Sequence, residues 1–136
     1  MDRDALRWSV VESGMAEVEV GMVEVERVGE MLSEVVEMGE MVCVRHRIPA
    51  GFDSVPFYSG LPDDMCPCEH WCYLAKGRLR YRFGDGRVLV VDAGEAFHLE
   101  AGHLADVVED AELIEFTRAA DYRRKAEHLA RQAGAR

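Results

Sequence analysis

The sequence predicts an all-β protein, an antiparallel sandwich or barrel that ends in an α-helix. Short apolar segments follow one another at nearly regular spacing between residues 70 and 117, and glycines mark the turns between them. The chain has 136 residues, of which 49% are hydrophobic and 31% charged, so it suits one soluble domain with its own core. Within that domain we expect an acidic extension over residues 1–40, a barrel over 41–117 and a basic helix over 118–136.

The acidic extension is expected to contain a strand and a short helix. Residues 16–20 alternate apolar and acidic side chains, as in a half-buried strand. The apolar residues of segment 28–36 recur with helical spacing, so we expect a short helix that ends near Gly39, although its β-branched valines would also suit a strand. Nine glutamates lie within residues 12–40, and we expect them to form a solvated face that affects solubility or subunit pairing more than a functional site.

The barrel strands are predicted from alternating apolar residues and from the turns between them. A strand over residues 41–48 should lead into irregular chain over 49–64, where proline and glycine recur. The further expected strands span 70–74, 78–83, 87–91, 95–99, 105–108 and 113–116, with a Gly84-Asp85-Gly86 hairpin turn among them.

The final helix is expected to follow Thr117, whose hydroxyl can cap it. Its apolar stripe consists of Tyr122, Ala126, Leu129 and Ala133. The helix is basic, and its charge is opposite to that of the N-terminal stretch. Opposite charges favour contact between these two segments, within one subunit or between subunits.

The charge and hydropathy of the chain bound its partners and its location. A net charge of −10 argues against nucleic acid and anionic membrane surfaces as partners. No apolar segment approaches the roughly 20 residues needed to cross a bilayer, and the N-terminus lacks the apolar stretch of a signal peptide. We therefore expect a cytoplasmic protein.

Three of the four cysteines lie within seven residues, and this cluster is the strongest chemical signal in the sequence. In a reducing compartment such clustering favours metal ligation or reactive thiols over disulfides. Cys66, Cys68 and His70 share the parity of one strand face. A fully extended chain would hold residues 66 and 70 about 13 Å apart, so they can bind one ion only if the chain bends, and the intervening proline would favour a bend. For Cys43 and Cys72 we favour simple core packing.

The segment from Gly60 to Gly77 resembles the first sequence motif of the cupin superfamily, in which a glycine precedes His-x-His, a glutamate and a second glycine. Here Cys66 and Cys68 stand in place of the two histidines, and His70 takes the place of the glutamate. The spacer before His70 is also shorter than in the usual motif.

The second cupin motif is matched at its glycines, Gly94 and Gly102. The residues that stand where its proline, histidine and asparagine would be are Glu100, Ala105 and Glu109. His103, directly after the second glycine, is offset by two residues and can supply an imidazole instead. The chain looks most like a group of small single-domain cupins, over about residues 45–117. That likeness also rests on Phe52-Asp53, Leu61-Pro-Asp-Asp64, His70-Trp71 and Ala101-Gly102-His103.

The resemblance implies a jelly-roll barrel, or double-stranded β-helix, with a metal site in its mouth. The implied ligands are Cys66, Cys68, His70 and His103, with either cysteine as the thiolate. A thiolate with two imidazoles suits Zn²⁺ and leaves one coordination position open, while Fe, Ni and Cu are alternatives.

Three further residues are candidates for a role next to the metal or the ligand. His98 and Glu100 lie close to His103 in the sequence and can support a ligand or act as acid or base, with a surface or core role as the alternative. Tyr58 lies on the approach to the cysteine cluster, where it can contact a ligand or pack the barrel.

These observations support three hypotheses about function. The first is a metal-binding cupin that binds or transforms a small molecule in the barrel mouth. The second is a non-enzymatic ligand-binding or sensor module, with a structural metal or redox-responsive Cys66 and Cys68 thiols. The third is a metal-free barrel whose cysteines fill the core. We also expect a homodimer, because small cupins commonly pair through edge strands and the valine-rich N-terminal strand has few obvious partners in its own barrel.

Overall fold

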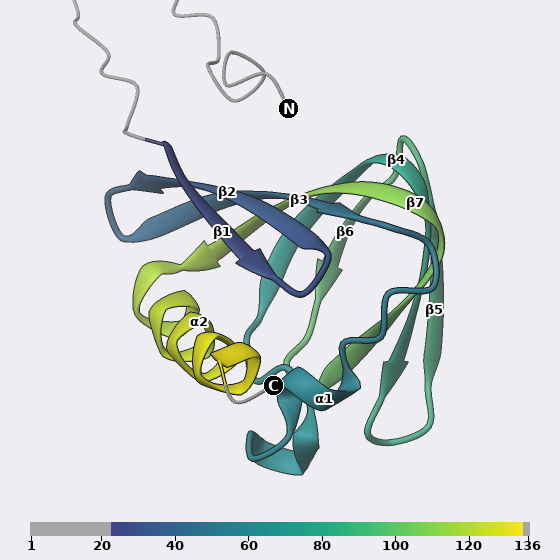
Figure 1. Cartoon of the computed structure of the whole chain (residues 1–136). Helices are drawn as coiled ribbons and strands as arrows, with labels where there is room; N and C mark the ends of the chain where they lie inside the picture. Colours follow the sequence, from purple (N-terminus) through teal and green to yellow (C-terminus); the bar gives the residue numbers. More distant parts are fainter. Residues whose placement is uncertain (1–22, 135–136) are drawn as a thin grey trace, which may run out of the picture.

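A computed structural model describes residues 23–134 of the chain, and these residues form an antiparallel β-sheet closed by a C-terminal helix (Figure 1). The strands are β1 (Val23–Val28), β2 (Met31–Met38), β3 (Met41–Ile48), β4 (His70–Phe83), β5 (Val88–Asp92), β6 (Ala96–Leu99) and β7 (His103–Arg118). The helical segments are α1 (Val55–Tyr58), the 3-10 turn η2 (Pro62–Asp64) and α2 (Ala119–Gly134). The strand order is β1-β2-β3-β7-β4-β5, with β6 also paired to β4. The predicted all-β fold with a C-terminal helix is confirmed.

The two longest strands, β4 and β7, bend around the barrel and replace two predicted pairs of shorter strands (Figure 1). One end of β4 pairs with β6 and the other with β5, while β7 pairs with it on the opposite edge. The ladder between β4 and β7 is interrupted between Leu74 and Leu79. Gly77 lies in this interruption with φ +92°, and a Cβ there would lie 2.3 Å from the Asp110 carbonyl oxygen. Only glycine therefore fits where the two strands approach each other at the bend.

Segment 28–39 is not the helix that its apolar spacing predicts. It contains the turn into β2 and then β2 itself, which pairs with β1 and with β3. Val28 pairs with Met31, and Met38 pairs with Met41, so two-residue turns join the three strands. Residues 33–36 are all buried, so both faces of β2 are covered here and the two-residue apolar period is lost. The expected strand over residues 16–20 lies outside the described residues.

The helix α2 is present as predicted, but Thr117 does not cap it. Thr117 is fully buried within β7, and the helix begins at Ala119. The helix packs against the β1–β2 hairpin, β3 and α1 (Figure 1). Tyr122 donates a 2.6 Å hydrogen bond to Glu26 on β1. The basic helix therefore contacts the acidic segment within one subunit, as their opposite charges favour.

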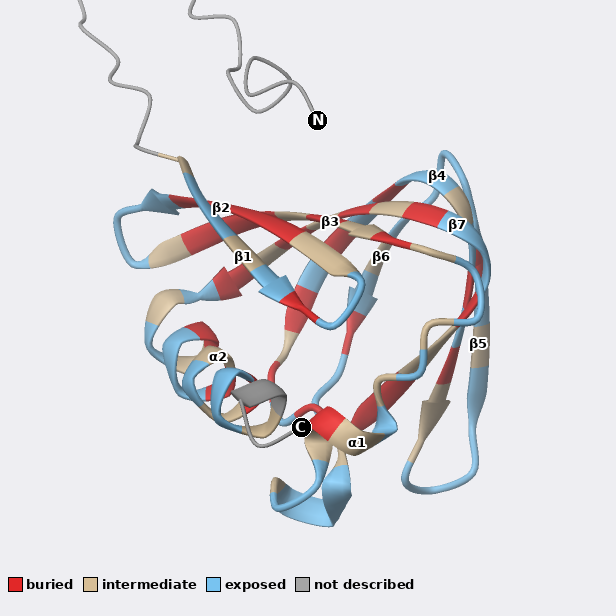
Figure 2. Ribbon diagram, in the orientation of Figure 1, coloured by how far each residue is buried: buried red, intermediate tan, exposed pale blue. Residues whose placement is uncertain are grey.

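The main apolar core lies between the inner faces of β3 to β7, where buried residues concentrate (Figure 2). Its largest fully buried side chains include Tyr81, Leu74 and Leu79. This core borders a cavity of about 540 Å³, which the β1–β2 hairpin, α1 and α2 enclose on other sides. Among residues 23–134, no helix has the length and apolar character that crossing a membrane requires.

Candidate metal centre

Three buried side chains converge beside this cavity. Cys66, His70 and His103 each offer one ligand atom, and these atoms all lie within 4.8 Å of one another. The Cys66 sulfur lies 3.4 Å from Nε2 of His70. The rings of His70 and His103 meet edge to face, with their centroids 5.3 Å apart. The group therefore has the size and the donor atoms of a metal site with three protein ligands.

Backbone hydrogen bonds hold the segment at Cys66 against the turn at Gly102 and His103. The Cys66 N–H donates to the His103 carbonyl at 2.9 Å, and the Gly102 N–H donates to the Cys66 carbonyl at 2.7 Å. His70 begins β4, and residues 67–69 between it and Cys66 lie outside any strand. The chain therefore bends between Cys66 and His70, as their spacing requires if both are to reach one point.

Hydrogen bonds on the far side of each imidazole orient both rings toward the cysteine. Nδ1 of His103 lies 2.6 Å from the Glu100 carbonyl oxygen, which can only accept, so Nδ1 carries the proton. Nδ1 of His70 lies 2.6 Å from Oγ1 of Thr117 and donates to it in the same tautomer. Both Nε2 atoms then keep their lone pairs, which is the arrangement that holds metal-binding histidines in place.

The third donor, the Cys66 sulfur, is held as a thiolate. Burial raises the pKa of this thiol, but the hydrogen bond from Cys68 and the charge of Lys125 lower it below its ordinary value. A thiolate and two imidazoles are donors that divalent cations such as Zn²⁺ bind. These residues therefore fit a metal by their chemistry as well as by their spacing.

The remaining cysteines have other surroundings. Cys68 is buried, and its sulfur lies 3.5 Å from the Asp121 carbonyl oxygen at the start of α2. The hydrogen bond with Cys66 and burial raise the pKa of Cys68, so it stays a neutral thiol beside a thiolate. Cys72 belongs to the main core, and Cys43 is completely buried. The structure thus gathers three of the four proposed ligands and places Cys68 next to them.

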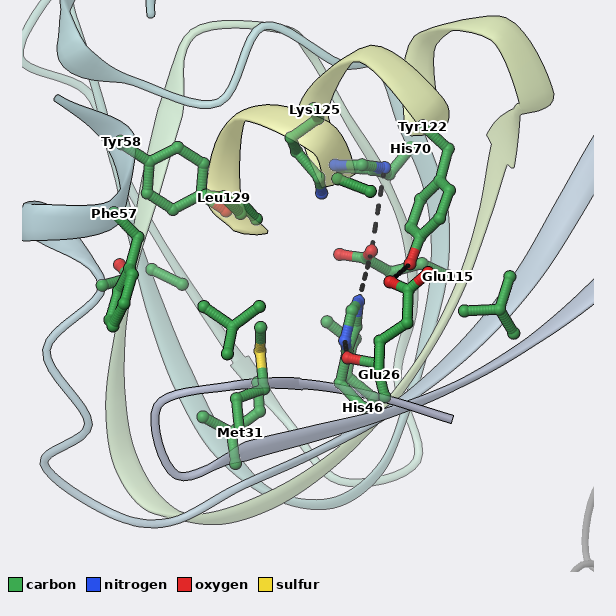
Figure 3. A pocket seen from close by; sticks show the side chains of 18 of the residues that line it. Glu26, Met31, His46, Phe57, Tyr58, His70, Glu115, Tyr122, Lys125 and Leu129 are labelled. Carbon is green, nitrogen blue, oxygen red and sulfur yellow. Dashed lines mark hydrogen bonds and ion pairs between the residues drawn. The ribbon is translucent and has the colours of Figure 1, made fainter. Parts of the chain in front are cut away.

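Of the three further candidates, His98 and the Glu100 carboxylate form ion pairs away from the cavity, whereas Tyr58 lies on the cavity wall. His98 forms a 2.6 Å ion pair with Glu69, and its side chain is 47% exposed. Glu100 supports His103 through its backbone carbonyl, while its carboxylate pairs with Arg87 at 2.9 Å. Tyr58, at the end of α1, lines the cavity (Figure 3).

A buried polar chain continues from the candidate ligands along the cavity wall (Figure 3). Glu115 lies 3.9 Å from Nδ1 of His70 and 2.8 Å from Nε2 of His46. Nδ1 of His46 in turn contacts the Ser33 hydroxyl at 2.7 Å. Burial raises the pKa of Glu115, but the hydrogen bond from His46 and the charge of Lys125 contribute to lowering it below its ordinary value, so the carboxylate is ionised. The sequence alone did not reveal this chain, although Glu115 and Thr117 share the inward parity of Leu113 on β7.

Lys125 is the second polar feature that sequence reasoning missed. It projects from α2 into the cavity (Figure 3) and is 5% exposed. Burial lowers the pKa of its ammonium, but Cys66, Tyr58 and Glu115 raise it well above its ordinary value, so the charge is retained. A signal was available: Lys125 follows Tyr122 by three residues and precedes Leu129 by four, which places a cation within the apolar stripe of the helix.

The acidic stretch also reaches the cavity, although it was expected to affect solubility or pairing more than a functional site. Glu24, Glu26 and Glu37 lie in its lining, on strands β1 and β2. Glu26 accepts a hydrogen bond from the Tyr122 hydroxyl, and Glu37 forms an ion pair with Arg123. These two glutamates therefore help to fasten α2 over the cavity.

The protein has the cupin fold, as comparison with solved structures shows. An RmlC-like cupin from Shewanella frigidimarina matches 71% of this chain and 83% of its own, with 17% sequence identity and a TM-score of 0.52. Hydroxypropylphosphonic acid epoxidase from S. wedmorenis matches 74% of this chain and 59% of its own, with 13% identity and a TM-score of 0.55. A variant of oxalate decarboxylase from B. subtilis matches 71% of this chain and 27% of its own, with 15% identity and a TM-score of 0.50.

The likeness is one of fold and not of sequence. No family model and no curated protein matches the sequence. The jelly-roll barrel implied by the resemblance to the cupin motifs is confirmed, and Cys66, His70 and His103 form a possible metal-binding site in it.

Proposed function

We propose that this protein is a metal-dependent cupin that holds a divalent cation through Cys66, His70 and His103 and binds or transforms a small molecule in the cavity. The observation that carries the proposal is the orientation of the two imidazoles. Each donates its Nδ1–H to a fixed oxygen, which leaves both Nε2 atoms facing one buried thiolate. Both histidines also line the cavity, so a cation held there would be open to a ligand.

The cation that this donor set suits best is Zn²⁺, because one thiolate and two imidazoles are common zinc ligands. Iron, nickel and copper are the alternatives, since softness of the ligands does not select among them. One structure with this fold, HppE, is described with iron(II).

Metal analysis of the purified protein tests the proposal. We expect about one equivalent of metal per chain, lost in His103→Ala and retained in His98→Ala, whose ring lies in an exposed ion pair. An anomalous-scattering map would identify the ligands and show whether Cys66 or Cys68 supplies the sulfur. Absence of stoichiometric metal after expression in medium supplied with all four metals, together with no binding in vitro, would refute the proposal.

Removing the metal separates a site that serves a ligand from a structural one. Because the three side chains lie on strands and turns with their own hydrogen bonds, we expect a chelator to lower the melting temperature only modestly. If the metal were structural, the protein would instead lose most of its stability on chelation, and the bound metal would have no open coordination position.

A sensor role is the second candidate, and the contact between Cys66 and Cys68 favours it. A neutral thiol beside a buried thiolate can form a disulfide, with loss of one proton and two electrons to an oxidant such as hydrogen peroxide, which is reduced to water and hydroxide. Mass spectrometry of the metal-free protein after peroxide treatment tests this role. Loss of two hydrogen masses in the wild type, absent in Cys68→Ser, would support it, and an unchanged mass would count against it.

We further propose a cytoplasmic homodimer with a small-molecule ligand and without nucleic acid or membrane partners. The net charge of −10 supports the exclusion of polyanions. Light scattering during gel filtration tests the assembly, because a particle of 15.3 kDa would be a monomer and would contradict it. Cell fractionation tests the location.

A further inference from the structure

The cavity has a polar half and an apolar half (Figure 3). The polar half contains His70, Glu115 and Lys125. The apolar half is formed by Met31, Phe57 and Leu129, which come from β2, α1 and α2 and pack around one another. A volume of about 540 Å³ lies within the range of small-molecule sites. A ligand that fills both halves must itself have a polar end and an apolar body.

Lys125 shows which charge the polar end carries. Its ammonium forms no hydrogen bond and no ion pair with any residue in the part of the chain that the structure describes, and the Tyr122 ring lies 5.8 Å from it. Cys66 and Glu115 act on this ammonium without a hydrogen bond or an ion pair, and a buried charge that no group contacts directly is costly. Lysines are almost never buried in this way unless they are paired, so this one points to a partner that binds from the cavity.

Three of the acidic side chains on the cavity wall are engaged with other residues. Glu115 accepts a hydrogen bond from His46 and faces His70. Glu26 is hydrogen-bonded to Tyr122, and Glu37 forms an ion pair on the helix surface. Glu24 and Glu127 also line the cavity, but both are exposed to solvent. With the metal in place, the cavity next to Lys125 is therefore electropositive.

We propose that the ligand is a small organic anion with an apolar body, such as a carboxylate or a phosphonate, whose charged group lies between Lys125 and the metal. This inference rests on the proposed function and names its ligand class. The apolar body would lie against Phe57, Met31 and Leu129. Tyr58 adds a second donor beside Lys125: burial raises the pKa of its phenol, which outweighs the lowering by the lysine, so the hydroxyl keeps its proton.

The test is isothermal titration calorimetry with four probes of equal chain length: hexanoate, hexylphosphonate, 1-hexanol and hexylamine. Each is titrated into metal-loaded and chelator-treated wild-type protein, into Lys125→Met and into Lys125→Arg. Methionine matches the length of lysine without its charge, and arginine keeps the charge. We expect both anions to bind the loaded wild type, with the alcohol and the amine about 10- to 100-fold weaker. Lys125→Met should bind the two anions more weakly by a similar factor, whereas Lys125→Arg should keep part of the wild-type affinity for them.

Metal content and melting temperature are measured for every variant, so that three failures can be told apart. Equal affinity for hexanoate and hexanol in the wild type would overturn the inference. So would a Lys125→Met variant that binds anions normally, or one that loses its metal instead, because Lys125 would then serve the thiolate. If no metal is bound but the anions still bind through Lys125, the ligand class stands and the proposed metal function fails. Should Lys125→Met not fold, Tyr58→Phe, which removes only the second donor, is expected to weaken anion binding and leave hexanol binding unchanged.

Discussion

Thr117 should determine how well the candidate site holds a metal, although it is not itself a ligand. Its hydroxyl lies 2.6 Å from Nδ1 of His70, in surroundings where both residues are almost completely buried. In Thr117→Val this oxygen is replaced by a methyl group of nearly the same shape. The Glu115 carboxylate, 3.9 Å from the same nitrogen, is too far away to accept the bond without moving.

The expected cost follows from the buried N–H. An unsatisfied buried donor costs about 1–3 kcal/mol, and loss of a hydrogen bond that orients a metal-binding histidine reduces metal affinity about 10- to 100-fold. Competition against a chromogenic zinc chelator measures that affinity. The matched control is Thr117→Ser, which keeps the hydroxyl and should bind zinc almost as the wild type does. If Thr117→Val binds zinc as tightly as the wild type, or if the serine variant is equally weakened, the orientation of His70 does not depend on this bond.

Two further predictions concern stability. Gly77→Ala should lower the unfolding free energy by several kcal/mol, on the order of the largest single-residue effects, because the new Cβ would meet the Asp110 carbonyl at 2.3 Å. Gly94→Ala is its control, with φ +93° and nothing within 4 Å, and should cost only about 1–2 kcal/mol of backbone strain in urea titrations; equal costs would contradict the role given to the close approach. Burial and then Glu115 raise the pKa of Cys43 from 9.0 to about 11, so the protonated thiol is favoured in the folded state. That stabilisation is complete below pH 9 and is lost as the pH rises toward 11, by about 2–3 kcal/mol. Between pH 9 and pH 11 the unfolding free energy of Cys43→Ala should therefore fall by about 2–3 kcal/mol less than that of the wild type. Identical pH profiles of stability for the two proteins would refute this role of Cys43.

Much of the fold could be predicted from local sequence, because turns and strand alternation are local properties. The strand at residues 41–48 and the Gly84-Asp85-Gly86 turn follow from such signals. The helix predicted over 28–36 fails for a reason that is not local. Four consecutive residues of β2, 33–36, are buried, and Val35 packs against Tyr122 of the distant helix α2, so the apolar spacing does not reveal the period of the strand.

In the candidate site, too, features with a local sequence signal could be predicted, and contacts between distant residues could not. Cys66, His70 and His103 were found from parity and from the resemblance to the cupin motifs. Their supporting contacts were not, because Thr117 meets His70 across 47 residues and only strand register brings them together. Lys125 was missed as well, although its place within the apolar stripe of α2 is visible in the sequence.

Two parts of the chain form the cavity: one carries the candidate metal ligands, and the other covers the cavity. The barrel strands and turns between Cys66 and Thr117 carry the candidate metal ligands and their hydrogen-bond partners. The covering wall comes from the β1–β2 hairpin and α2, at the two ends of the described chain. Substitutions in this wall can therefore change which molecule is accepted without disturbing the metal, so a protein engineer seeking a new ligand would redesign the ends and keep the middle.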